Sequence, residues 1–270
     1  SPYGRPSTGS GDTATITALS RADLVATHDA WIRPDNATVF IVSDQPLSAV
    51  LPQLEAAFGD WRAPATAKGT KDFTAAVPAT TSRIVLIDRP QSPQSLIYGG
   101  AVLPVSGTDD LLALNAANVT LGSDFLSRIN SDLRETKGWS YGVRGGVNAL
   151  QHRVPYIVNA PVQANRTGDS LAALIAQYDR FLQTDGVTPT ELERTINGNT
   201  RSLAGGFETS GQILGALRSN ALYGRPDDYQ TTLASRTRAL TAAQMDAAAR
   251  QVIHPDQFVW VVVGDASVVR

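Results

Sequence analysis

The stretch ALTAAQMDAAARQVIHPDQFVWVVVGD, residues 239–265, decides the fold. Its pattern occurs a second time in the chain, at residues 18–44, as ALSRADLVATHDAWIRPDNATVFIVSD. The two segments align without a gap, and they share Ala-Leu at the start, Pro-Asp in the middle and Asp at the end. A preceding YGRP, at 3–6 and again at 223–226, extends the match. Self-similarity of this kind indicates two copies of one structural unit.

Each copy predicts a helix, a Pro-Asp turn and a strand. The helix begins after a hydroxyl cap with a polar partner three residues later, which is Ser20 with Asp23 in the first copy and Thr241 with Gln244 in the second. It ends before the proline, because the residue preceding a proline disfavours helical geometry. The β-branched and aromatic runs that follow, TVFIVSD and FVWVVVGD, are typical of strands.

Strands are expected in adjacent pairs along the rest of the chain, with helices between the pairs. The expected strands are 82–88, 95–103, 139–149 and 154–162, and the helices between the second and third are 109–122 and 124–138. Pairs of this kind favour a largely antiparallel sheet with helices packed on one face, which is an α+β domain.

The two copies predict two related domains. The second copy closes a long segment, whereas little sequence precedes the first, so we expect a first domain whose N-terminal part, somewhat over about a hundred residues, lies outside this sequence. Residues 63–80 are rich in Ala, Thr, Pro and Lys without periodicity, which is typical of a linker. The predicted division is 1–64, the C-terminal part of one domain, and 65–270, a complete domain of similar fold.

Composition excludes several functions. The 270 residues carry a formal net charge of −2, which gives no electrostatic reason to bind nucleic acid or an anionic membrane. No apolar run approaches the roughly 18 residues of a spanning helix. There are no cysteines, and the three histidines, His28, His152 and His254, are too dispersed for a zinc site. We therefore expect no metal ligands in this chain.

The segment LGSDFLSRINSDLRETKGWSYGV, residues 121–143, resembles a signature of the insulysin–pitrilysin family of zinc metallopeptidases, the inverzincins, which includes mitochondrial processing peptidase. The matching positions are Leu121-Gly122, Phe125, Ser127-Arg128, Leu133-Arg134-Glu135, Gly138 and Tyr141. SPYGRPSTG at the start, the strand after Pro34, and AAFGDW also resemble family segments. Ser123 departs from the second glycine of the family turn, and the zinc motif His-x-x-Glu-His is absent.

The resemblance implies a clamshell of two halves that closes around a peptide. In the family, an arginine and a tyrosine spaced like Arg134 and Tyr141 face the zinc site from the opposite half. A tyrosine hydroxyl can donate to the oxyanion formed during peptide hydrolysis, and an arginine fork can hold a neighbouring carbonyl. The resemblance thus implies two catalytic residues here, Arg134 and Tyr141, with zinc in a partner half or subunit and a peptide as substrate.

Two alternatives stay open from the sequence. Arg134 could simply pair with Asp132 or Glu135 while Tyr141 packs in the sheet, and the chain could be a non-catalytic homologue that acts as a scaffold or peptide-binding subunit. Lacking the zinc motif, the chain is expected to be inactive alone. Bacterial relatives of this kind suggest a periplasmic or cell-envelope location, which nothing in the composition decides.

Overall fold

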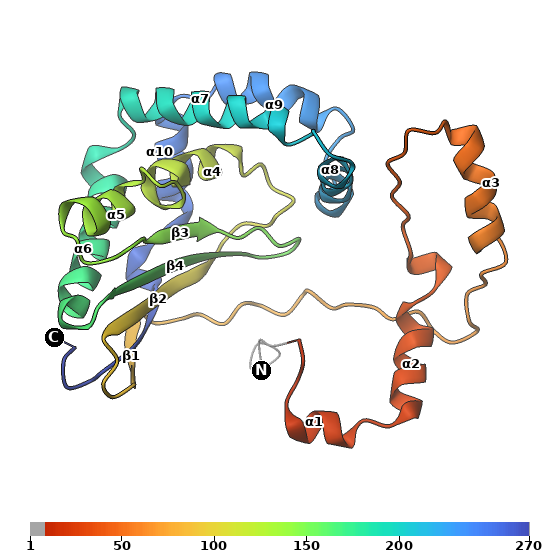
Figure 1. Cartoon of the computed structure of the whole chain (residues 1–270), viewed down its shortest axis with the longest axis horizontal. Helices are drawn as coiled ribbons and strands as arrows, with labels where there is room; N and C mark the ends of the chain where they lie inside the picture. The colour runs from red at the N-terminus through yellow and green to blue at the C-terminus, as the bar shows by residue number, and fades with distance from the viewer. Residues whose placement is uncertain (1–8, 270) are drawn as a thin grey trace. The chain divides into compact units, whose positions relative to one another are not determined.

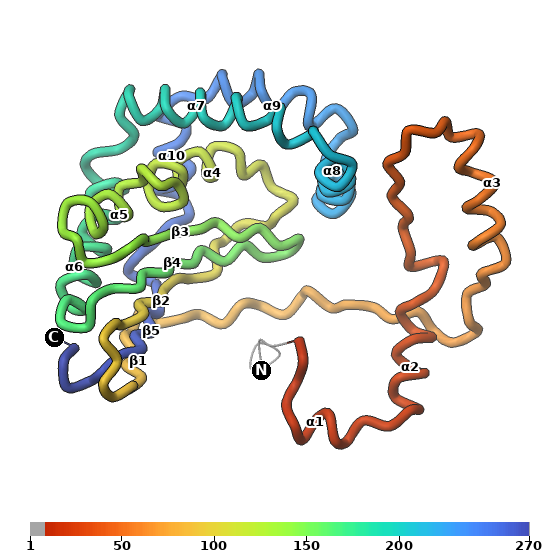
Figure 2. Tube along the Cα trace, in the orientation of Figure 1, coloured from red at the N-terminus to blue at the C-terminus, as the bar shows by residue number. Residues whose placement is uncertain are grey.

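The computed structural model describes residues 9–269, which divide into two compact units (Figures 1 and 2). The first unit runs to Val77 and includes Thr209–Arg218, and the second comprises Pro78–Glu208 with Ser219–Arg270. The YGRP match at 3–6 lies outside the described residues. The predicted boundary between 64 and 65 stays a prediction.

The first unit is built from short helices. They are α1 (Thr13–Ala18), α2 (Arg21–Trp31), the 3-10 turn η1 (Pro34–Asn36) and α3 (Leu47–Phe58). The buried Arg33 side chain holds the unit together, because its Nη1 donates to the Thr66 carbonyl at 2.8 Å and its Nε to the Asp35 carboxylate at 2.5 Å. The segment after the first repeat helix is thereby tied to the segment that follows α3.

The second unit contains one five-stranded sheet in the order β1-β5-β2-β4-β3. Its strands are β1 (Arg83–Asp88), β2 (Gln94–Leu103), β3 (Arg144–Val147), β4 (Val154–Gln163) and β5 (Val259–Gly264). β1 and β5 are parallel, and every other pairing is antiparallel. The predicted α+β class with a largely antiparallel sheet is confirmed.

Helices complete this unit. They are α4 (Leu112–Asn118), η2 (Val119–Ser123), α5 (Arg128–Asn130), η3 (Ser131–Thr136), η4 (Ala164–Arg166), α6 (Thr167–Asp179), η5 (Arg180–Asp185), α7 (Pro189–Gly205), α9 (Tyr229–Arg238), α10 (Ala242–Val252) and η6 (Pro255–Gln257). The further helix α8 (Ser210–Tyr223) belongs to the first unit up to Arg218. In Figure 1, α4, α5 and α7 lie on the same side of the strands.

The core lies between the sheet and these helices. Alternate residues of β4 are buried, as its period of two predicts, and they are Val154, Tyr156, Val158, Ala160 and Val162. Tyr156 stacks on Phe258 with ring centroids 5.7 Å apart, and Tyr178 meets both rings edge-on. The opposite positions of β2 and β5 are more exposed, so the sheet is covered on one face within this unit.

The repeat is confirmed in part. Both copies have the helix, both have the capping box, and both have a 3-10 turn at Pro-Asp. The second copy ends in β5 and completes a sheet of five strands, as predicted. The prediction of a strand at 38–44 is wrong for this structure, because 37–43 have no regular secondary structure. A strand needs a neighbour to share its hydrogen bonds, and this segment pairs with none among residues 9–269.

Candidate functional site

The corner at residues 128–147 begins as a helix and ends as β3. α5 continues as the π-helical η3, and Leu133 anchors it with a fully buried side chain. The turn is closed by the Trp139 amide, which donates to the Leu133 carbonyl at 2.9 Å. Gly138 between them has φ of +67°. This left-handed conformation strains any residue with a Cβ, so the glycine lets the chain leave the helix at this point.

The segment around Tyr141 is held by β4. The Trp139 carbonyl accepts from the Gln163 amide at 2.9 Å, and the Ser140 hydroxyl donates to the Pro161 carbonyl at 2.5 Å. These bonds place Tyr141 in a bend before β3, which begins at Arg144, so the prediction of a strand that already starts at 139 is wrong. Its side chain is 88% exposed, and the hydroxyl has no hydrogen-bond partner within residues 9–269. Tyr141 is therefore a free phenol on a firmly held backbone.

Arg134 lies in the last turn of the helix with its side chain about one-third exposed. Its Nε is 3.2 Å from Glu135 Oε1, and its Cζ lies 4.4 Å from the centre of the Phe125 ring. Asp132 is ion-paired with Lys137 instead. The local pairing considered for Arg134 is thus present with Glu135, whereas Tyr141 does not pack in the sheet. Among the described residues, the terminal nitrogens of Arg134 make no hydrogen bond.

Arg128 fixes the start of this helix to α7. Its Nε and Nη2 donate to the two oxygens of Glu191, at 2.8 and 2.7 Å, and both side chains are only 15% exposed. Glu191 also closes the capping box of α7, because it accepts from the Thr188 amide at 2.9 Å. Burial acts to raise the pKa of Glu191, but the hydrogen bonds from Arg128 and Thr188 hold it below its ordinary value. The ion pair keeps the pKa of Arg128 raised.

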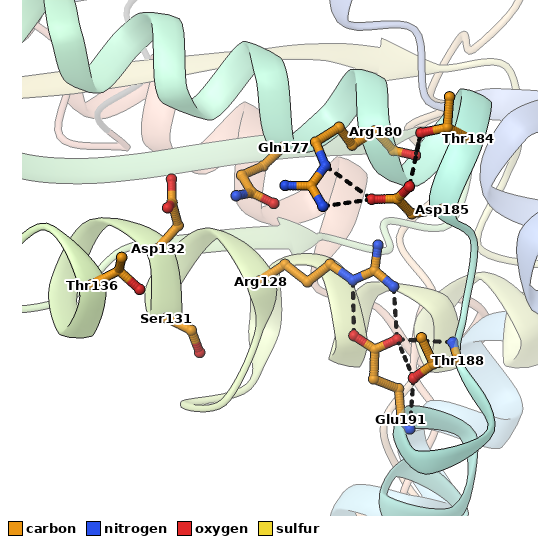
Figure 3. Close-up of a pocket in the computed structure, with 10 residues that line it drawn as sticks. All are labelled: Arg128, Ser131, Asp132, Thr136, Gln177, Arg180, Thr184, Asp185, Thr188 and Glu191. Atoms are coloured by element: carbon orange, nitrogen blue, oxygen red, sulfur yellow. Dashed lines mark hydrogen bonds and ion pairs between the residues drawn. The ribbon is translucent and has the colours of Figure 1, made fainter.

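The pairing of Arg128 with Glu191 has no signal in the sequence, because it joins residues 63 positions apart. These two side chains line an open pocket of about 720 Å³, drawn in Figure 3. Arg180 and Asp185 face them there as a second ion pair, at 2.7 Å. Arg134 and Tyr141 are not among the lining residues. Because the arginines of the pocket are paired with carboxylates, we interpret it as structural support for the corner.

The donor set does not fit zinc. In the part of the chain that the structure describes, no group of three or more His, Cys, Asp or Glu side chains could hold a metal ion. His28 contacts Asp29 at 3.0 Å, and His254 Nε2 lies 3.3 Å from the Gln251 carbonyl oxygen, so each takes part in a local contact. Among residues 9–269 there is also no helix long and apolar enough to cross a membrane.

The fold and the corner define an α+β domain of the metallopeptidase type whose described residues bring no metal ligands together. The chain belongs to the family described as the Peptidase M16 inactive domain, whose family model matches residues 18–199. The membership predicted from the motif around Arg134 and Tyr141 is thereby confirmed.

Similar proteins agree with this assignment. Proteins named as uncharacterized zinc proteases in Mycobacterium tuberculosis and Mycobacterium bovis are 24% identical over 258 residues, which cover 93% of this chain and 57% of each relative. The peptidase M16 inactive domain from Pseudomonas fluorescens has a TM-score of 0.84 at 25% identity, covering 97% of this chain and 62% of that one. A Helicobacter pylori protease has a TM-score of 0.83 at 17% identity, which shows the fold alone. This chain thus spans about 57% of its curated relatives' length.

Proposed function

We propose that this chain is the substrate-gripping region of a two-half zinc metalloendopeptidase, in which Arg134 and Tyr141 face a zinc site supplied by another half or subunit. The observation that carries the proposal is the state of Tyr141. A phenol that is 88% exposed, without a hydrogen-bond partner among the described residues, contributes little to the fold. Its backbone is nevertheless fixed on both sides by hydrogen bonds, directly or through Ser140, to β4. This arrangement suits a donor that acts on something outside the chain.

The two residues would have different tasks. The Tyr141 hydroxyl would donate one hydrogen bond to the oxyanion that develops on the scissile carbonyl, where a preorganised donor has its largest effect. Arg134 would offer its two terminal nitrogens to a neighbouring backbone carbonyl of the substrate, because its Nε already faces Glu135. The Phe125 ring supports the flat side of the guanidinium. The zinc chemistry belongs to the partner, since the donor set here does not fit the metal.

The exposure of apolar side chains in the first copy of the repeat supports a role as part of a larger assembly. Leu24 and Ile41 in the first copy of the repeat are 61% and 40% exposed, whereas the matching Met245 and Val262 in the second copy are 0% and 3% exposed. The first copy therefore has the same apolar pattern as the packed second copy, but its apolar side chains stay exposed to solvent. We propose that residues 1–64 are the C-terminal part of a second α+β domain, whose other strands would pair with 38–44.

The test measures turnover after the chain is combined with the polypeptide that carries His-x-x-Glu-His. We expect that polypeptide to be encoded in the same reading frame or in the neighbouring one. Tyr141→Phe removes one hydroxyl and should lower kcat by about 10²–10³ with the melting temperature unchanged. Arg134→Lys keeps the charge and loses the fork, so it should mainly raise KM. Tyr98→Phe, at another exposed tyrosine, is the matched control.

A non-catalytic scaffold is the competing function, and the ion pair of Arg134 with Glu135 favours it, since that contact needs no substrate. If Tyr141→Phe and Tyr98→Phe both leave kcat within about twofold of the wild type, Tyr141 is no transition-state donor and the scaffold function holds. The same follows if no neighbouring sequence carries His-x-x-Glu-His.

A further inference from the structure

Asn130 connects the two sides of the corner through one buried amide. Its side chain is fully buried on α5. The Nδ2 group donates to the Phe125 carbonyl at 2.6 Å, and the Oδ1 atom accepts from the Val143 amide at 2.8 Å. Only this orientation satisfies both neighbours, because a carbonyl needs a donor and an amide needs an acceptor. One rigid group therefore sets the separation between two backbone segments.

Each of these segments supports one member of the proposed pair. Phe125 supplies the ring beneath the Arg134 guanidinium, 4.4 Å from its Cζ. Val143 lies two residues after Tyr141, and its fully buried side chain anchors the chain at the start of β3. A shift of either segment would move the phenol relative to the guanidinium. Buried bonds of this kind are costly to leave unmade, by about 1–3 kcal/mol for each unpaired group.

The remaining link between these segments is weaker. Arg144 Nη1 donates to the Asp124 carbonyl at 2.9 Å, but Arg144 is exposed, and an exposed bond exchanges readily with water. Asn118 offers a comparison, because it is another buried asparagine with both ends bonded. It donates to the Gly145 carbonyl at 3.0 Å and accepts from the Tyr156 hydroxyl at 2.9 Å, so it contacts β3 without contacting either segment of the pair.

We propose that Asn130 is a positioning residue that holds the Phe125 platform of Arg134 and the Tyr141 backbone in the geometry needed for the reaction. The inference rests on the proposed function. Asn130 does not touch the substrate and acts through the two residues that do. Misplacing a catalytic group by about 1 Å can cost up to about 100-fold in rate. The loss of this amide should therefore appear in kcat as well as in stability.

The experiment is a double-mutant cycle in the reconstituted enzyme, using Asn130→Asp and Tyr141→Phe singly and together. Asn130→Asp keeps an acceptor for Val143 and loses the donor to Phe125. We expect it to lower kcat by about 10-fold or more in the wild-type background and by a clearly smaller factor when Tyr141 is already Phe, because only the misplaced platform of Arg134 then affects the rate. Asn118→Asp is the matched control, which should lower the melting temperature by a similar amount while kcat changes by less than about twofold.

The outcomes separate the two proposals. If Asn130→Asp lowers kcat equally in both backgrounds, or if Asn118→Asp lowers it just as much, Asn130 is merely structural and the inference is overturned while the proposed function stands. If Tyr141→Phe alone has no effect, the proposed function fails and this inference fails with it. Should Asn130→Asp not fold, the cycle is repeated with Asn130→Ser, whose uncharged hydroxyl is too short to reach both segments.

Discussion

Removing the Glu191 carboxylate tests what stabilises the corner. Glu191 accepts two hydrogen bonds from Arg128, at 2.8 and 2.7 Å, and two from Thr188, both at 2.9 Å. Glu191→Ala would break all four and leave Arg128 largely buried without its counter-ion. Breaking a buried ion pair from one side costs about 3–5 kcal/mol, and a lost cap adds about 1 kcal/mol. Since both side chains are 15% exposed, we expect a total cost near the lower limit of this sum, about 4 kcal/mol.

Glu191→Gln separates the charge from the cap. Glutamine serves as well as glutamate in a capping box, so the bonds with Thr188 should survive. The amide oxygen of glutamine can still accept from Thr188 and from Arg128 Nη2, but its amide nitrogen cannot accept from Arg128 Nε. One charge-assisted bond is therefore lost and the other becomes an ordinary one, and we expect a loss of about 2 kcal/mol. Each kcal/mol corresponds to roughly 2–4 °C in the melting temperature of a domain of this size, so Glu191→Ala should melt about 10 °C below the wild type.

The pH dependence gives an independent check. The folded-state pKa of Glu191 is lowered from its ordinary value of 4.5, so the unfolded chain takes up the proton first as the pH falls. The stabilisation is present above 4.5 and is lost as the pH falls below that value through the folded-state pKa. Glu191→Gln should therefore be less sensitive to acid than the wild type.

The assay is urea unfolding at pH 7 and at steps below pH 4.5, with the exposed Glu193→Ala as the control. We expect Glu193→Ala to stay within about 0.5 kcal/mol of the wild type. The reasoning is refuted if Glu191→Ala is no less stable than Glu193→Ala at pH 7. It is also refuted if Glu191→Gln loses stability with acid as steeply as the wild type does.

The remaining predictions use the chain alone. Elemental analysis of the purified chain should find no stoichiometric zinc, and tight one-to-one zinc would contradict the assignment of the metal to a partner. Tyr156→Phe should cost about 1–3 kcal/mol in urea unfolding, because the buried hydroxyl bonds Asn118 and Tyr178. Burial raises the pKa of Tyr156 and of Tyr178 above 10, so the free energy of unfolding should fall as the pH rises through 10. A free energy of unfolding that stays unchanged up to pH 11 would contradict this. Ile41→Asp should leave the melting temperature almost unchanged, whereas Val262→Asp at the matching buried position should unfold the second unit. Equal effects of the two substitutions would show instead that both copies are equally well packed.

The sequence predicted those features that depend on neighbouring residues. The capping boxes at Ser20 and Thr241 follow from residues three positions apart, and the alternation along β4 follows from a period of two. The pairing of Arg128 with Glu191 could not be predicted, because two distant segments meet only in the folded chain.

The candidate site was predicted less well than the fold. The assignment of Arg134 and Tyr141 from the motif stays a prediction, and the run of strand-forming residues gave no sign that the chain would bend before β3. The bend depends on the positive φ of Gly138 and on the bonds from 139 and 140 to β4, which are tertiary contacts. The role of Asn130 was also missed, because an asparagine inside a helix has no local signal for its two partners.

The position of β5 between β1 and β2 has a consequence for biosynthesis. Ser82, just before β1, bonds to the Phe258 carbonyl, 176 residues away, just before β5. The strand that joins β1 to β2 is therefore translated after every other strand of this sheet. Until it emerges, β1 has no neighbour and the inner edge of β2 is open, with apolar side chains that favour aggregation. We expect the second unit to fold only after translation of residues 259–264, and nascent chains that stop earlier to depend on chaperones.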